Sequence, residues 1–244
     1  MHRDPDQSAR EEPSATAPWL LTVAAAAEAE AVLQGLGVDA PLPAEWHPFE
    51  ASDRLVVVVT GIGKSNAAAA TAGALGSRTF GAVLNLGIAG SLPVATPLDL
   101  GDTVIATRSI YADEGLVLPD GSFIGCSDMG FPFGPFDDWG VRGDPSLLDA
   151  LAGLATVTAP IATVSTCSAT DPLARTVVER TWAVAEAMEG AAVGHVAARR
   201  GVPFLELRAV SNTTGDRGNQ RWSIRLALDR VRELAAGVAA AAAR

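Results

Sequence analysis

Short apolar segments alternate along the chain with longer alanine-rich stretches. Seven of the apolar segments are continuous and rich in Val, Leu and Ile, which is typical of strands buried on both faces of a sheet. They cover residues 19–25, 55–60, 82–86, 103–107, 161–165, 184–188 and 204–210. The other stretches predict helices over 28–35, 64–76, 145–152, 171–180, 190–200 and 219–243. The alternation predicts an α/β fold, a three-layer α/β/α sandwich around a mixed, largely parallel sheet.

The first 18 residues are polar and proline-bearing, unlike the rest of the chain. They predict a flexible tail, and residues 19–244 predict one domain. Within that domain, residues 111–144 have no helical periodicity and carry three phenylalanines between prolines, from Phe131 to Phe136. A loop of this length in a compact domain is usually functional or mobile. The aromatic run fits either a wall over a ligand or a contact with a second subunit.

The composition excludes several classes of protein. Of the 244 residues 48% are hydrophobic, enough for a large core, and the net charge of −10 without a Lys/Arg block argues against nucleic acid. Cys126 and Cys167 are too few for a disulfide framework and lack the spacing of a zinc site, so we expect no metal. Glu28 and Glu30 interrupt the first long apolar stretch, and acidic residues precede it where a signal sequence is basic. We expect a cytoplasmic protein with no membrane partner.

Polar residues gather directly after five of the predicted strands. Ligands of an open α/β sheet bind at the carboxyl ends of its strands, so we expect these residues to converge on one small-molecule cleft. They are Thr60 to Lys64, Gly87 to Gly90, Ser165 to Cys167, Met188–Glu189 and Ser211–Asn212. The first group lacks the third glycine of a dinucleotide-binding loop, and no histidine lies near Cys167 in the sequence. We therefore expect the chemistry to rest on carboxylates.

Glu189 is the most informative of these residues. It ends one apolar run and is followed by small residues, while Asn212 ends the next such run. A carboxylate and an amide delivered by two strand ends suggest a ligand site. The alternative interpretation is that Glu189 only opens a helix, where a carboxylate favours the positive end of the dipole.

The same segments resemble a known family. The chain is similar to the futalosine hydrolase branch of the purine nucleoside phosphorylase and nucleosidase superfamily, with the motifs in family order. The motifs are Thr60 to Lys64, Leu86 to Gly90, Leu100 to Asp102, Met188 to Ala192 and Arg208 to Asn212, with Ala26 to Glu30, Val164 to Cys167 and Gly215 to Trp222 shared with that branch. The resemblance implies hydrolysis of futalosine to hypoxanthine, in a route to menaquinone, without a cofactor. It also implies a homodimer or a larger homo-oligomer.

The resemblance assigns roles to individual residues. Glu189 matches the carboxylate that holds the ribose hydroxyls, and Glu30 matches the one that takes a proton from the attacking water, with Glu28 as the alternative. Arg208 matches the arginine that steadies that water and its base. The other substrate-binding residues by resemblance are Gly61, Gly87, Ile88, Ala89, Thr166, Cys167 and Met188.

Asn212 distinguishes the base. Adenine-specific relatives have an aspartate there, whereas an amide that both donates and accepts suits a 6-oxopurine such as hypoxanthine. An asparagine is no proton donor, so we expect it to stabilise the protonated base through hydrogen bonds, with Asp216 as a candidate acid. Asn85 and Ile88 supply neither charge nor hydroxyl for a phosphate, which favours water as the acceptor.

Several alternatives stay open on the sequence. The protein could be a purine nucleoside phosphorylase, a nucleosidase acting on methylthioadenosine or adenosylhomocysteine, or a nucleoside-binding protein without activity. Ala169 stands where an aromatic that stacks on the base is common in the wider family. The aryl carboxylate on the 5′ side of futalosine calls for an arginine, for which the candidates are Arg108, Arg217 and Arg221.

Overall fold

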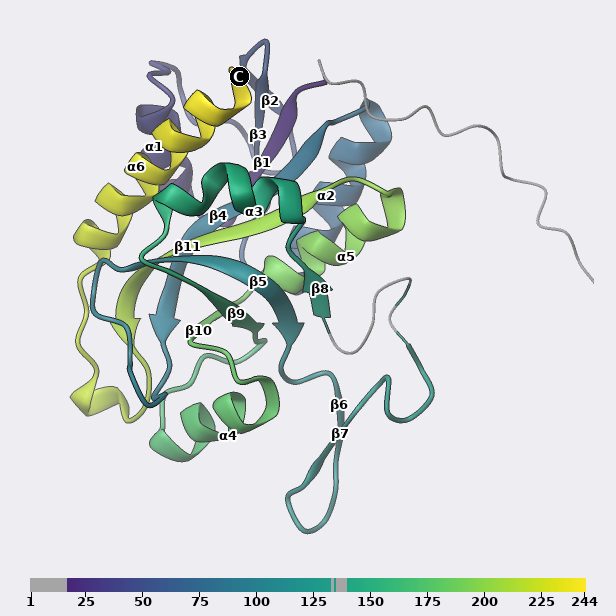
Figure 1. The fold of residues 1–244 in the computed structure, drawn as a ribbon, viewed down its shortest axis with the longest axis vertical. Coiled ribbons are helices and arrows are strands. Elements are labelled where there is room, and N and C mark those ends of the chain that lie inside the picture. The colour runs from purple at the N-terminus through teal and green to yellow at the C-terminus, as the bar shows by residue number, and fades with distance from the viewer. Residues whose placement is uncertain (1–16, 133, 135–139) are drawn as a thin grey trace, which may run out of the picture.

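A nine-stranded mixed sheet forms the centre of the molecule, in a computed structural model that describes residues 17–132, 134 and 140–244 (Figure 1). The strand order is β10-β9-β5-β11-β4-β1-β3-β2, with β8 paired to β5. The strands are β1 (Trp19–Val23), β2 (Phe49–Ser52), β3 (Leu55–Val59), β4 (Ala82–Ser91), β5 (Thr103–Tyr111), β8 (Gly140–Arg142), β9 (Val157–Thr163), β10 (Ala185–Ala187) and β11 (Phe204–Thr213). All seven predicted strands are present, and the mixed α/β fold is confirmed.

Helices cover the sheet on both faces (Figure 1). Helices α1, α3 and α6 pack on one face and α2 and α5 on the other, while α4 packs against β9. Their bounds are α1 (Ala26–Gly35), α2 (Lys64–Ser77), α3 (Pro145–Leu151), α4 (Asp171–Thr181), α5 (Gly190–Arg200) and α6 (Ile224–Ala242). Short 3₁₀ turns lie at Ala152–Leu154 and Arg217–Asn219.

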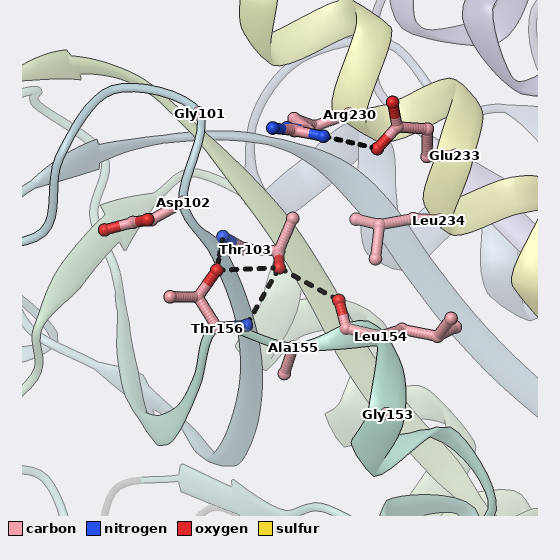
Figure 2. A pocket seen from close by; sticks show the side chains of 10 residues that line it. All are labelled: Gly101, Asp102, Thr103, Gly153, Leu154, Ala155, Thr156, Arg230, Glu233 and Leu234. Atoms are coloured by element: carbon pink, nitrogen blue, oxygen red, sulfur yellow. Dashed lines mark hydrogen bonds and ion pairs between the residues drawn. The ribbon is translucent and has the colours of Figure 1, made fainter.

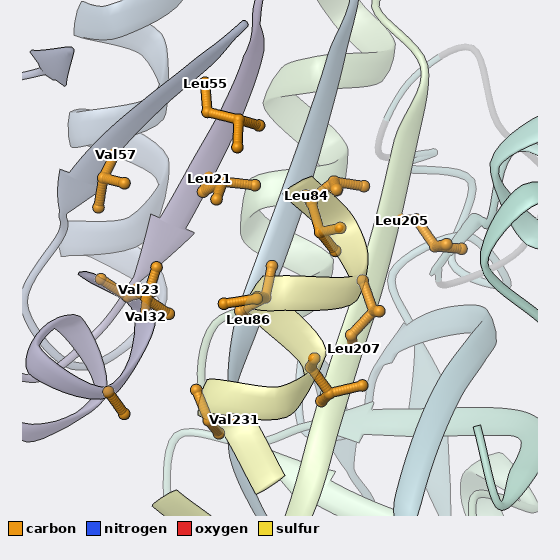
Figure 3. Close-up of a cluster of buried hydrophobic side chains, with 14 of the residues drawn as sticks. Leu21, Val23, Val32, Leu55, Val57, Leu84, Leu86, Leu205, Leu207 and Val231 are labelled. Carbon is orange, nitrogen blue, oxygen red and sulfur yellow. The ribbon is translucent and has the colours of Figure 1, made fainter. Parts of the chain in front are cut away.

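The apolar runs form the core because they are buried along their whole length. Leu84 and Leu86 of β4 and Leu207 of β11 pack beneath α6, where Val231 is fully buried (Figure 3). β3 is buried at each of its five positions. Continuous burial of this kind requires cover on both faces, which the two helical layers provide.

The sheet curls so far that one strand joins two parts of it. β10 pairs in parallel with β9 and also antiparallel with β4, so that β10, β9, β5, β11 and β4 form a closed ring. Glu186 of β10 lies opposite Gly90 of β4 in this pairing. The closure brings the ends of β4, β10 and β11 together, which an open sheet would leave apart.

The structure adds elements that the hydrophobic pattern does not predict. Strands β6 (Gly115–Val117) and β7 (Phe123–Gly125) form a hairpin that projects from the body within the predicted long loop (Figure 1). Phe131 is exposed, while the prediction for Phe136 lies outside the described residues, as does nearly all of the predicted tail.

Candidate active site

A cavity of about 260 Å³ lies where β4, β10 and β11 end, and is called the site cavity below. It extends to the start of α1 and of α6, and it combines an apolar wall with three carboxylates. Its lining residues include Glu28, Ile62, Ile88, Ala89, Gly90, Cys167, Glu186, Met188, Glu189, Ser211, Asn212, Trp222, Ile224 and Leu228. All five predicted polar groups therefore contribute to one cavity, the first of them through Ile62. This arrangement is the default position for a ligand in such a fold.

Glu189 is buried at the N-terminus of α5, but its side chain does not cap that helix. Its Oε1 accepts a hydrogen bond from the N–H of Gly63 at 3.0 Å, and its Oε2 accepts one from Nη2 of Arg208 at 3.3 Å. Gly63 has a φ of 91°, a left-handed conformation that favours glycine and turns its N–H toward the carboxylate. Glu189 is therefore held by two distant segments, which the helix-opening interpretation does not explain.

The first helix delivers Glu28, not Glu30, to the site cavity. Glu30 is exposed on α1 and does not line the cavity, so its predicted place was wrong and the alternative, Glu28, occupies it. Residues two positions apart on a helix are separated by about 200° around its axis, which puts these two side chains on opposite sides of α1. Glu28 is buried, and its oxygens accept hydrogen bonds from the N–H groups of Ile88 at 2.8 Å and Ala25 at 2.9 Å.

Arg208 lies behind the cavity wall and joins the acidic groups. It is fully buried on β11, where its Nε donates to Glu206 at 2.8 Å and its Nη2 to Glu189 at 3.3 Å. The same Nη2 donates to the side-chain oxygen of Asn85. Arg208 does not line the cavity itself. The geometry suits an arginine that positions and balances carboxylates, a contact pattern that only the fold reveals.

Glu28 has a raised pKa because burial disfavours its charged form. The guanidinium of Arg208 and the N–H of Ile88 act in the opposite direction, and the nearby Glu189 acts with burial. A carboxylate with a raised pKa is a better proton acceptor near neutral pH than an ordinary glutamate. Glu28 therefore lies at the site cavity with a basicity above that of an ordinary glutamate.

Asn212 and Glu186 form the opposite part of the cavity wall. Asn212 accepts a hydrogen bond from Oγ of Ser211 at 2.8 Å and donates one to the carbonyl of Thr213 at 3.0 Å. Glu186 is buried beside it and is bound by Ser168. Sequence reasoning missed Glu186 because it stands inside an apolar run; a charge within a buried strand was the available signal.

The remaining predicted residues divide into two groups. Ile88, Ala89, Cys167 and Met188 line the site cavity as expected, and the Sγ of Cys167 lies 3.6 Å from the Sδ of Met188. Three others do not line it: Gly61, Gly87 and Thr166. Gly61 packs against Asn66, and Gly87 lies behind the wall against Arg208 and Glu28.

The three candidate arginines and Asp216 lie outside the site cavity. Arg217 lines a neighbouring cavity of about 100 Å³, called the side cavity below, with Glu186, Asn212 and Trp222. Arg221 is exposed and pairs with Asp99 at 3.7 Å, and Arg108 lies on β5 opposite β8. Asp216 exchanges hydrogen bonds with Asp171 and lines neither cavity.

A larger hollow elsewhere on the molecule, of about 410 Å³, contains none of the predicted site residues. Its polar groups bind one another: Arg230 pairs with Glu233 at 2.7 Å, and the hydroxyl of Thr103 donates to the carbonyl of Leu154 and accepts from the N–H of Thr156 (Figure 2). Such a self-satisfied polar surface offers a ligand little.

The described part of the chain offers neither a cluster of metal ligands nor a membrane-spanning helix. No group of three or more His, Cys, Asp or Glu residues in it is arranged to hold a metal ion. None of its helices is both long and apolar enough to cross a membrane.

Comparisons with known proteins show which family the chain belongs to. A family model described as "Phosphorylase superfamily" matches residues 45–244. A futalosine hydrolase of Acidothermus cellulolyticus is 38% identical, over 91% of this chain and 90% of its own. The chain belongs to the futalosine hydrolase family of the phosphorylase superfamily. A futalosine hydrolase of Streptomyces coelicolor is 37% identical, over 70% of this chain and 73% of its own.

Solved structures support the fold of this futalosine hydrolase family member. A 5′-methylthioadenosine/S-adenosylhomocysteine nucleosidase of Colwellia psychrerythraea, in complex with adenine, matches with a TM-score of 0.74. The match covers 93% of this chain and 96% of that one, at 20% identity. The family resemblance predicted from the motifs is confirmed by matches that extend over most of the chain.

Proposed function

We propose that this protein hydrolyses the N-glycosidic bond of futalosine and releases hypoxanthine; relatives that match it over 70% or more of its length are named futalosine hydrolase. The observation that carries the proposal is the meeting of Glu28, Glu189 and Asn212 in one cavity. A base for water, a carboxylate for the sugar and an amide for a purine are the parts that the reaction requires. The family resemblance implies that the reaction belongs to the futalosine route to menaquinone.

Glu28 activates the nucleophile in this account. Cleavage of the bond between C1′ and N9 passes through an oxocarbenium-like ribose, and water adds to C1′ while Glu28 takes its proton. Arg208 holds Glu189 from behind the wall, and through its charge it opposes the rise in the pKa of Glu28. Glu189 accepts hydrogen bonds from the ribose hydroxyls and favours positive charge on the sugar.

Water is the acceptor because the cavity does not suit a phosphate. Among the described residues that line it there is no Lys or Arg side chain, while three carboxylates repel an anion. The N–H of Ile88, a possible phosphate donor, is bound by Glu28. The nearby Lys64 pairs with Asp113 and Glu114.

Asn212 selects the 6-oxopurine. One N–H of its amide donates to Thr213, and an amide carries a second N–H that suits the O6 acceptor of hypoxanthine. The base lies between Asn212 and the apolar side chains of Met188 and Ile88, which replace the aromatic absent at Ala169.

The resemblance implies the assembly, and the composition of the chain leads us to expect the compartment. A cytoplasmic homo-oligomer, a dimer or larger, is part of the proposal. Exposed Ile62 and Ile224 at the cavity mouth are consistent with a wall that a second subunit completes.

A substrate panel tests the activity. The pure protein is incubated with futalosine, inosine, adenosine and methylthioadenosine, with and without phosphate, and free base is measured by chromatography. We expect hypoxanthine from futalosine at a rate that phosphate does not change. Release of adenine without hypoxanthine would favour the methylthioadenosine-type nucleosidase, turnover that requires phosphate would favour the phosphorylase, and binding without turnover would favour the nucleoside-binding protein.

A further inference from the structure

A second buried carboxyl group faces the purine end of the cavity and has no role in the reaction described so far. Glu186 is 5% exposed and lines both the site cavity and the side cavity. Its Oε1 accepts a hydrogen bond from the N–H of Ser168 at 2.7 Å, and its Oε2 is bonded to the hydroxyl of the same serine at 2.6 Å. Burying a carboxyl group is costly, so its position calls for an explanation.

The closed sheet places this carboxyl beside Asn212. Glu186 of β10 lies opposite Gly90 of β4. A Cβ atom on Gly90 would lie 3.1 Å from Nδ2 of Asn212 and 3.6 Å from Cγ of Glu186. The amide and the carboxyl therefore stand next to each other above a residue without a side chain, at the position where the base binds.

The departure of a 6-oxopurine needs an acid at this place. Its leaving group becomes stable when N7 receives a proton, and the amide of Asn212 has none to give. Asp216, the acid suggested by sequence, lies outside both cavities. Arg208 and Gly63 hold Glu189, and Glu28 lies beside Arg208 at Gly87, so both carboxylates belong to the sugar side of the cavity. Arg208 donates to Glu189 and acts through its charge on Glu28, whereas the hydrogen bonds that hold Glu186 come from the uncharged Ser168.

We infer that Glu186 is the general acid of the reaction, which protonates N7 of the departing purine while Asn212 binds its O6. The inference rests on the proposed hydrolysis. As the bond between C1′ and N9 breaks, its electron pair passes into the purine and the proton of Glu186 moves to N7. Water adds to C1′ and gives a proton to Glu28. Solvent then returns a proton to Glu186 and takes one from Glu28, so that nucleoside and water become hypoxanthine and the free sugar.

Burial favours the protonated form of Glu186. Burial raises its pKa, and the hydrogen bonds from Ser168 act in the opposite direction. The charged or titratable groups that share its two cavities are Cys167, Glu189, Arg217 and, farther along the site cavity, Glu28. Burial raises the pKa of the Cys167 thiol, and the nearby carboxylate of Glu189 acts in the same direction.

The pH dependence of two variants tests the inference. Because the acid must be protonated, kcat/KM for futalosine falls as pH rises through the pKa of Glu186, and this basic limb should disappear in Glu186→Gln. That variant should lose about 10²–10⁴-fold in kcat, the usual contribution of a general acid. Ser168→Ala removes a hydrogen bond to the ionised form, so its basic limb should move to higher pH. The exposed Glu30→Gln is the matched control and should keep the wild-type profile.

The results of these measurements distinguish a general acid at Glu186 from a positioning role. Calorimetric binding of hypoxanthine and the Tm should change little in Glu186→Gln. A Glu186→Gln protein with the wild-type basic limb, or one with a raised KM and an unchanged kcat, would overturn the inference and leave a positioning role. If Glu186→Gln does not fold, an unmoved limb in Ser168→Ala overturns it. A wild-type protein that releases no hypoxanthine refutes the proposed function itself, and the inference with it.

Discussion

Glu28 and Arg208 meet over Gly87, although they come from α1 and β11. A Cβ atom on Gly87 would lie 2.6 Å from Oε1 of Glu28 and closer still to Nη1 of Arg208. The guanidinium opposes the rise in the pKa of Glu28 that burial causes. The absence of a side chain at position 87 thus allows the approach that keeps a buried carboxylate usable as a base.

A side chain at position 87 should disturb both Glu28 and Arg208. Gly87→Ala should lower kcat/KM by about 100-fold, because the Cβ displaces Glu28 or Arg208, and should destabilise the protein by about 1–3 kcal/mol through overpacking. Hypoxanthine release and urea unfolding measure the two effects. Gly73→Ala is the control: this exposed glycine of α2 has open space around it, so the change should add about 0.5–1 kcal/mol of stability and leave activity unchanged. Equal behaviour of the two variants would contradict the prediction.

The acid side of the pH profile should report Glu28. Its pKa is raised by burial, and the base must be deprotonated, so kcat/KM should fall as pH falls through a midpoint above the ordinary glutamate value of about 4.3. Initial rates with futalosine across the acidic range provide the measurement. A midpoint at or below that ordinary value would show that another group controls the limb.

Arg208 should matter for stability as well as catalysis. Arg208→Ala leaves the carboxylates of Glu206 and Glu189 buried without their cation, which should cost about 3–5 kcal/mol in urea unfolding. Adding Glu206→Gln should restore part of this loss by removing one orphaned charge. Arg230→Ala, which breaks an exposed pair with Glu233, should cost about 0–1 kcal/mol. A small loss for Arg208→Ala would mean that the buried network is not held by its charge.

The purine preference should depend on Asn212. Asn212→Asp should lower the ratio of kcat/KM for inosine to that for adenosine at least about tenfold, because a carboxylate accepts from the 6-amino group and repels O6. The two nucleosides share one ribose, so the ratio isolates the base. The exposed Asn219→Asp serves as the control. An unchanged ratio would assign base selection to other residues.

The sequence predicts the buried framework well and the site in part. The run at 55–60 is apolar on both faces, which few structures other than a covered strand satisfy. The edge strand β2 and the β6–β7 hairpin lack that pattern, so they are found only in the structure. The placement of Glu189 and Asn212 at strand ends follows from the fold class.

The errors have a physical origin. The Ala-Glu repeat at the start of α1 offers two carboxylates, and periodicity alone does not decide whether Glu28 or Glu30 faces the sheet. Glu186 becomes visible only after β10 pairs with both β9 and β4, a closure that depends on contacts far apart in the chain. Local pattern therefore predicts which segments meet, and tertiary packing decides which atoms do.

The most direct test compares Glu28→Gln with Glu30→Gln on futalosine in phosphate-free buffer. Both changes replace a carboxylate of the same helix by an amide of the same shape, and only Glu28 borders the site cavity. We expect a loss of about 10²–10⁴-fold in kcat for Glu28→Gln and wild-type turnover for Glu30→Gln. Full activity of Glu28→Gln, or a comparable loss in Glu30→Gln, would contradict it.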